Sequence, residues 1–215
     1  MIRSGAVITG DIVNSTAMGS QATNRLATRL EELVKTSDAK LLSFYRGDSF
    51  QTYLADPTSA YSLALRLRTE AKLFENGEQV IETDLKISIG IGGIDTPVAD
   101  INKAQGAAFV LSGRGLDQLD KKGRRIMIQC ERPEFNVAME AISLFTDYLF
   151  SKLTHKQAEV LQRLLHNQTQ IETAKELDKS QSTVNRHAQS LGWGQLEELL
   201  KLYKECINQI TKTNE

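Results

Sequence analysis

The chain has 215 residues, 40% of them hydrophobic and 25% charged, and its formal net charge is −1. This composition is typical of a globular protein with room for one large domain, or for a domain and a small module. It excludes a disordered chain and one that coats nucleic acid by bulk charge. No apolar run approaches the roughly 18 residues that a membrane span needs, so we expect no membrane association and a cytoplasmic location.

The N-terminal part of the sequence predicts alternating strands and helices. A strand over 4–12 is followed by a helix over 21–36, a hairpin over 41–54, a helix from Pro57 to Phe74 and a strand over 85–92. This order of strand, helix, strand, strand, helix, strand is that of ferredoxin-like palms, in which the first and third strands are neighbours. The sequence therefore predicts an α+β fold with a βαββαβ domain.

Two aspartates follow apolar segments that this fold brings together. Asp11 comes at the end of the first strand, next to Gly10, and Asp48 lies in the tight turn of the hairpin. With the first and third strands paired, both carboxylates reach one edge of the sheet. All three histidines fall in the last third of the chain, so a metal here would need oxygen ligands, which favours Mg²⁺. The alternative is that both aspartates only form turns or caps.

The sequence after the fourth strand predicts a helix over 101–119, a strand over 124–130 and a helix over 135–150 that links to the tail. The last of these carries an apolar stripe at helical spacing. We expect the stripe to pack on the sheet or on a second subunit. It consists of Val137, Ala141, Leu144, Phe145 and Tyr148.

The C-terminal third predicts three short helices, each preceded by a capping residue: Thr154, Thr169 and Ser180. Their spacing is that of a helix-turn-helix motif, in which the start of the third helix meets bases in the major groove of DNA. Such helix triads also serve as protein-binding or packing modules. The residues predicted to contact DNA bases are Gln181, Ser182, Thr183, Asn185, Arg186 and Gln189, with Lys175 and Lys179 on the DNA backbone.

A final helix follows Trp193, which we expect to be a core anchor behind the third short helix. The apolar stripe of this final helix is expected to pack within the module or to pair subunits. It consists of Leu196, Leu199, Leu200, Tyr203, Ile207 and Ile210.

The motifs around Asp11 and Asp48 resemble those of class III nucleotide cyclase domains, over roughly residues 4–120. In that family, aspartates after the first strand and at the next hairpin hold two metal ions that bind a nucleoside triphosphate. The resemblance implies a Mg²⁺ site formed by Asp11, Asp48 and the backbone of Ile12. It also implies a phosphate contact from Arg114, and a homodimer, since catalytic pairs of this fold meet at a dimer seam. Arg46, in the hairpin turn, is also available to a phosphate.

One position departs from the cyclase pattern. The family places an asparagine four residues before the arginine that matches Arg114, and this chain has Val110 there. The departure argues against cyclase turnover but not against nucleotide binding. The chain is also similar to the SatD-like family of small bacterial proteins, through Gly10-Asp11, the hairpin segment Gly47–Gln51 and the segment Ala108–Leu116.

These observations divide the chain into a cyclase-like domain over 1–130, a linking helix within 131–152 and a helix-turn-helix module over 153–215. The predicted function is a DNA-binding transcriptional regulator whose degenerate cyclase-like domain senses a nucleotide or dimerises. The alternative is a divergent metal-dependent nucleotidyl cyclase or phosphotransferase.

Overall fold

The computed structural model describes residues 2–45, 47–75, 82–95 and 98–212. Its centre is a five-stranded sheet with the strand order β2-β3-β1-β4-β5. The strands are β1 (Ile2–Ile12), β2 (Ala39–Tyr45), β3 (Ser49–Leu54), β4 (Leu85–Asp95) and β5 (Ile126–Cys130). The helices between the strands are α1 (Ser15–Met18), α2 (Ser20–Lys35), α3 (Ala60–Lys72) and α4 (Ala107–Lys122). Those after β5 are α5 (Asn136–Ser151), α6 (His155–Leu165), α7 (Gln170–Glu176), α8 (Gln181–Leu191) and α9 (Trp193–Lys212).

The predicted α+β palm is confirmed by the pairing of its strands. β1 lies between β3 and β4 and is antiparallel to both, and β2 and β3 form the expected hairpin. β5 extends the sheet by pairing with β4 in parallel. A parallel pair requires a crossover connection, and α4 provides it.

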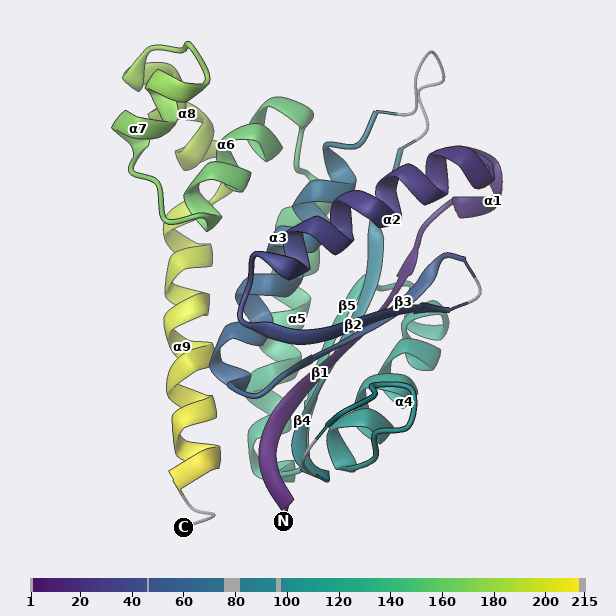
Figure 1. Ribbon diagram of the computed structural model, residues 1–215. Coiled ribbons are helices and arrows are strands. Elements are labelled where there is room, and N and C mark those ends of the chain that lie inside the picture. The colour runs from purple at the N-terminus through teal and green to yellow at the C-terminus, as the bar shows by residue number, and fades with distance from the viewer. Residues whose placement is uncertain (1, 46, 76–81, 96–97, 213–215) are drawn as a thin grey trace.

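The two faces of the sheet carry different layers (Figure 1). Because side chains alternate along a strand, Ala6 and Ile8 of β1 enter the main core with α2, α3 and α5, whereas Val7 enters a smaller cluster with Ala108 of α4. Asp11 has the same parity as Val7. It therefore belongs to the face that α4 covers.

The helix predicted over 101–119 begins later than expected, at Ala107. Asp95 donates its backbone N–H to the carbonyl of Gln105, and Gly106 forms a β-bridge with Ile94, so this segment is tied to the end of β4. Gly106 has a φ of 139°, and a Cβ there would lie 2.4 Å from the carbonyl oxygen of Gly93. The helix can start only after this close contact.

The α5 helix packs on the sheet with the face opposite to the predicted one. Met139, Ile142 and Phe150 lie in the main core, and Ser143 accepts a hydrogen bond from the backbone N–H of Ile128 at 3.1 Å. α5 thus packs on the sheet at β5, which was one of the two alternatives expected for this helix, but with other residues than those of the predicted stripe. The stripe predicted to pack is exposed along most of its length: Val137, Ala141, Leu144, Phe145 and Tyr148.

The α9 helix packs against the domain formed by the sheet and its covering helices. We expected it to pack within the C-terminal module or to pair subunits, and neither alternative included this contact. Tyr203 is fully buried, its hydroxyl donates to the carbonyl of Pro57 at 2.8 Å, and its ring lies 5.3 Å from that of Tyr61. Ile207 and Ile210 join the same core. Figure 1 shows α9 running back along the side of the sheet and its helices.

Helices α6, α7 and α8 form a small cluster with its own apolar centre, built from Val160, Leu164, Ala174, Val184 and Ala188. Trp193 packs against both this centre and the main core. None of the helices in the described part of the chain has the length and apolar character that crossing a bilayer demands.

Candidate functional site

The structure brings Asp11 and Asp48 to the same end of the sheet. Asp11 faces Ser49 in the β1–β3 register, directly after the turn that carries Asp48. The backbone N–H of Ile12 donates to the backbone carbonyl of Asp48 at 3.1 Å. The role of Ile12 seen here is thus to hold the hairpin turn against the end of β1.

Each carboxylate is oriented by a serine hydroxyl. Ser49 donates to Asp11 Oδ1 at 3.0 Å, and Ser15 at the start of α1 donates to Asp48 Oδ2 at 2.6 Å. The segment 14–16, which follows the first aspartate in sequence, therefore contacts the second aspartate in space.

Burial is the main reason why the pKa of Asp11 lies above its ordinary value; the hydrogen bond from Ser49 lowers it, and the charge of Asp48 raises it. Lys86 lies opposite Asp11 in the register of β4 and lowers the pKa of Asp11 less strongly. The ammonium of Lys86 pairs with Asp120 at 2.6 Å. The sequence reasoning missed Lys86 and Asp120. The sequence did carry a signal for Lys86, because it is a charged residue in a strand whose apolar residues alternate.

Replacing Asp11 with asparagine is expected to stabilise the protein in the absence of divalent cations. Because folding raises the pKa of Asp11, its ionised form opposes folding; this cost is absent below the unfolded pKa and fully present above the folded one. Solvent screens this partly exposed group, so we expect the melting temperature to rise by only about 1–3 °C near neutral pH. The gain should vanish near pH 4. Thermal unfolding at several pH values measures it, and an equal gain at all pH values would contradict this origin.

The oxygen donors at this end of the sheet fit a hard cation. Mg²⁺ is commonly held by one or two carboxylates, with water and phosphate oxygens completing its shell. Asp11 and Asp48 supply such a pair. Within the described residues, no group of three or more His, Cys, Asp or Glu side chains gathers at one point, so a closed protein cage for a metal is not present there.

Of the two predicted phosphate contacts, the structure describes only Arg114. Arg114 and Val110 both lie on the exposed side of α4, and no hydrogen bond or ion pair among the described residues links Arg114 to either aspartate. Arg46 lies outside the described residues. The backbone of α4 lies close to the sheet at Gly90. A Cβ at this position would lie 2.1 Å from the carbonyl oxygen of Ala108, so the approach depends on the absence of a side chain.

The second candidate site is the exposed side of α8. Ser180 caps this helix by accepting a hydrogen bond from the backbone N–H of Thr183, and Val184 and Ala188 fix its inner face in the α6–α8 cluster. Thr183 is partly buried. The remaining predicted contacts on α8 are exposed: Gln181, Ser182, Asn185, Arg186 and Gln189. Lys179 is partly buried and forms an ion pair with Glu159 at 2.7 Å.

The fold is that of an α+β palm domain with an attached helical cluster. No protein-family model and no curated protein sequence matches the chain. Solved structures with a similar fold include a bacterial light-regulated adenylyl cyclase, which is 12% identical over 60% of this chain and 76% of that one, with a TM-score of 0.49. The guanylyl cyclase Cya2 is 14% identical over 60% and 75% of the two chains, with a TM-score of 0.44. The adenylyl cyclase CyaB from P. aeruginosa is 13% identical over 60% and 77%, with a TM-score of 0.44.

Proposed function

We propose that this protein is a DNA-binding regulator that reads base edges with the start of α8. The observation that carries the proposal is the exposed polar set on α8, projected from a helix whose other face is fixed by packing. On this proposal the chain is a SatD-like protein that acts as a homodimer, and its palm domain serves for dimerisation or for sensing a nucleotide.

The arrangement of α7 and α8 supports a helix-turn-helix reading. The two helices are joined by the short turn 177–180, in which Asp178 has a φ of 50°, and Ala174 of α7 packs in the same cluster as Val184 of α8. A small residue at this contact lets the helices approach closely. The first turns of α8 then remain free to enter a major groove.

The side chains on α8 have the chemistry of base readout. The amides of Gln181, Asn185 and Gln189 match the donor and acceptor pattern of adenine, and Arg186 suits guanine or a phosphate. Lys179 is engaged by Glu159, so its predicted backbone contact would require that ion pair to open. Lys175 is exposed on α7 and is the better candidate for the phosphate contact.

DNA selection tests the proposal. The wild-type protein is expected to enrich a defined sequence from a random pool, and the double variant Gln181→Ala/Arg186→Ala should bind that sequence about 30-fold or more weakly, since each lost base contact costs roughly 1–3 kcal/mol. The matched control is Gln195→Ala/Lys201→Ala, which removes one amide and one cation from exposed positions on α9. The control should bind like the wild type. Sequence-specific binding retained by the α8 variant would refute the assignment.

A second candidate function is metal-dependent nucleotide chemistry at Asp11 and Asp48. The specific support is that Asp11 and Asp48 lie at the same end of the sheet, with the pKa of Asp11 raised by burial and, to a lesser degree, by the charge of Asp48. A ligand that binds the folded state raises its melting temperature. On this reading, Mg²⁺ with a nucleoside triphosphate stabilises the wild type but not Asp48→Asn, and any turnover is lost in Asp11→Ala. A shift that persists in Asp48→Asn would contradict it.

A further inference from the structure

The α5 helix carries apolar side chains on its outer face. Among the described residues, half of the large hydrophobic side chains that are exposed lie on α5; Val137 is 81% exposed and Leu144 is 54% exposed. They belong to the outer stripe of α5, which consists of Val137, Ala141, Leu144, Phe145 and Tyr148. A helix at the surface of a domain ordinarily turns polar residues toward the solvent. An apolar outer face of this length therefore indicates contact with another surface.

α5 cannot bury this stripe by turning about its own axis. On the opposite side of the helix, Ile142 lies in the main core. Ser143 accepts the backbone N–H of Ile128 at 3.1 Å, and Thr146 shares a hydrogen bond of 2.6 Å with Tyr61. These contacts fix the rotation of the helix, so the stripe stays on the outside.

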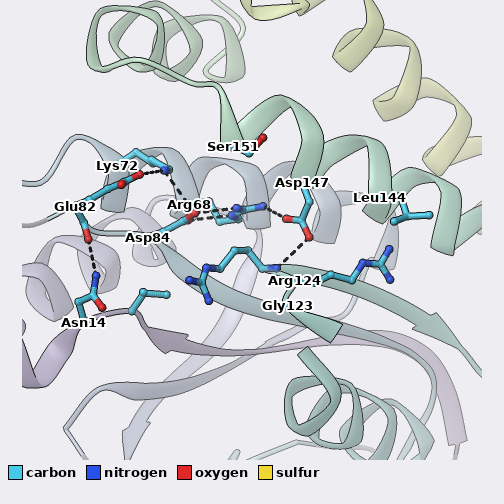
Figure 2. Close-up of a pocket in the computed structure, with 12 residues that line it drawn as sticks. Asn14, Arg68, Lys72, Glu82, Asp84, Gly123, Arg124, Leu144, Asp147 and Ser151 are labelled. Atoms are coloured by element: carbon cyan, nitrogen blue, oxygen red, sulfur yellow. Dashed lines mark hydrogen bonds and ion pairs between the residues drawn. The ribbon is translucent and has the colours of Figure 1, made fainter. Parts of the chain in front are cut away.

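The two acidic residues of α5, which flank the stripe, are paired within the chain. Figure 2 shows Asp147 directed toward Arg68, whose Nη1 lies 2.9 Å from Asp147 Oδ1. Glu140 accepts a hydrogen bond from Arg124 at 2.6 Å. Because both carboxylates have a cationic partner in their own chain, a second surface can cover the stripe without stranding a charge.

Four residues of the stripe have the spacing of a seam between two helices. They follow one another at intervals of four, three and four residues, which is the a/d repeat of coiled coils: Val137, Ala141, Leu144 and Tyr148. The hydroxyl of Tyr148 is hydrogen-bonded to Lys152 of the same chain at 2.6 Å, so burying the ring leaves no unpaired polar group. The occupant that this spacing fits is a second helix.

The order of side-chain sizes along the seam matches the same seam run in the opposite direction. When two copies of α5 are antiparallel with Ala141 of one facing Leu144 of the other, Val137 of one faces Tyr148 of the other. Each layer then joins a smaller side chain to a larger one, which fills the seam evenly. A parallel pair would place Tyr148 against Tyr148 and Ala141 against Ala141, so that one layer is crowded and another is empty.

The charges at the two ends of α5 favour the same orientation. Lys152 follows the end of the helix, and the segment 131–134 before its start contains two glutamates and one arginine. Antiparallel copies bring these oppositely charged ends together, and the two helix dipoles then also oppose each other. A parallel pair would bring like charges together.

We propose that two copies of this chain pair through the outer stripe of α5, as an antiparallel seam with two-fold symmetry. A two-fold axis makes one patch meet itself, which is the arrangement that the sizes and charges fit. This inference rests on the homodimer of the proposed function and names its surface, but it does not depend on DNA binding. One pair of helices buries less area than a standard interface, so we expect a dissociation constant in the micromolar range.

Sedimentation velocity of the full chain tests the proposal, from about 1 to 500 µM, a range that brackets a micromolar dissociation constant. Leu144→Glu should raise the dissociation constant about 100-fold or more, because each dimer would bury two carboxylates. The matched control is Leu202→Glu, which places the same charge at a leucine of α9 that is 49% exposed. It should change the dissociation constant less than about twofold. Circular dichroism confirms that each variant is folded.

Three outcomes would overturn the proposal. Wild-type protein that is monomeric over the whole range would show that something other than a second copy covers the stripe. A dimer that survives Leu144→Glu would show that the copies meet at another surface, while the homodimer of the proposed function would stand. Equal losses in Leu144→Glu and Leu202→Glu would show a general effect of charge. A dimeric wild type that selects no DNA sequence would instead refute the proposed regulator and leave the seam intact.

Disulfide trapping tests the orientation of the seam in a Cys206→Ser background, in which the remaining Cys130 is buried. A mixture of Val137→Cys and Tyr148→Cys proteins should form a linked dimer on oxidation, whereas neither protein should do so alone. A disulfide needs Cα atoms within about 7 Å, which the antiparallel seam provides only between these two positions. Linked dimers from each protein alone would show a parallel pair and overturn the antiparallel seam.

Discussion

Replacing Arg68 with alanine is expected to lower the free energy of unfolding by about 3–5 kcal/mol, because Asp84 and Asp147 lose the buried guanidinium that they share. Lys72, at 3.8 Å from Asp84, and the backbone N–H groups that Asp147 accepts offset only part of this loss. The Arg68 side chain is 1% exposed, and its guanidinium also lies 4.4 Å from the centre of the Phe150 ring. The single residue thus joins α3, the start of β4 and α5. Urea unfolding followed by circular dichroism measures the loss.

Two controls separate the buried charge from the volume of the side chain. Arg66→Ala removes an arginine from the same helix that is only partly buried and hydrogen-bonds His166, and it should cost about 1 kcal/mol. The neutral triple variant Arg68→Met/Asp84→Asn/Asp147→Asn should recover much of the loss, since buried ion networks can be replaced by uncharged groups of similar volume. A loss in Arg68→Ala no larger than that in Arg66→Ala would contradict the role of the network.

Replacing Tyr203 with alanine is expected to cost about 3–5 kcal/mol, because a fully buried aromatic ring is removed from the seam between α9 and the α/β part. Tyr203→Phe keeps the ring and loses only the hydrogen bond to Pro57, so it should cost about 1 kcal/mol. Leu202 is the neighbouring residue and is 49% exposed; Leu202→Ala should change stability by less than about 0.5 kcal/mol.

The shape of the unfolding curve of Tyr203→Ala tests how the C-terminal part is joined to the palm. Since Ile207 and Ile210 share the main core with strands β1 and β4, we expect one cooperative transition at lower denaturant concentration. Two separate transitions would show that the 153–215 segment folds independently of the sheet. The domain division made from the sequence would then describe the folding units.

The hairpin, the βαββαβ order and the three short helices could be predicted because their signals are local. Alternation, helical spacing and the caps at Thr154, Thr169 and Ser180 each act within one element. The approach of Asp11 to Asp48 followed from the topology, because a ferredoxin-like order makes the first and third strands neighbours. Those two carboxylates are the part of the candidate site that the sequence could supply.

The face with which each helix packs could not be predicted from the local sequence pattern. In α5 two faces were apolar enough to pack. The less hydrophobic face is the one that packs, and two hydrogen bonds favour it: one from the backbone of Ile128 to Ser143 and one between Tyr61 and Thr146. Similarly, the stripe of α9 fitted several partners, and only the position of Pro57 and Tyr61 decided which one it covers.

The sequence by itself thus determined the elements, their order and the oxygen-donor pair at the end of β1, because short-range spacing and strand topology fix these. Only the tertiary structure decided that Lys86 and Asp120 stand beside that pair, and that Arg68 joins the carboxylates of Asp84 and Asp147. The physical reason is that pairing of charges depends on which side chains meet across elements distant in sequence. That information appears only when the helices are seated on the sheet.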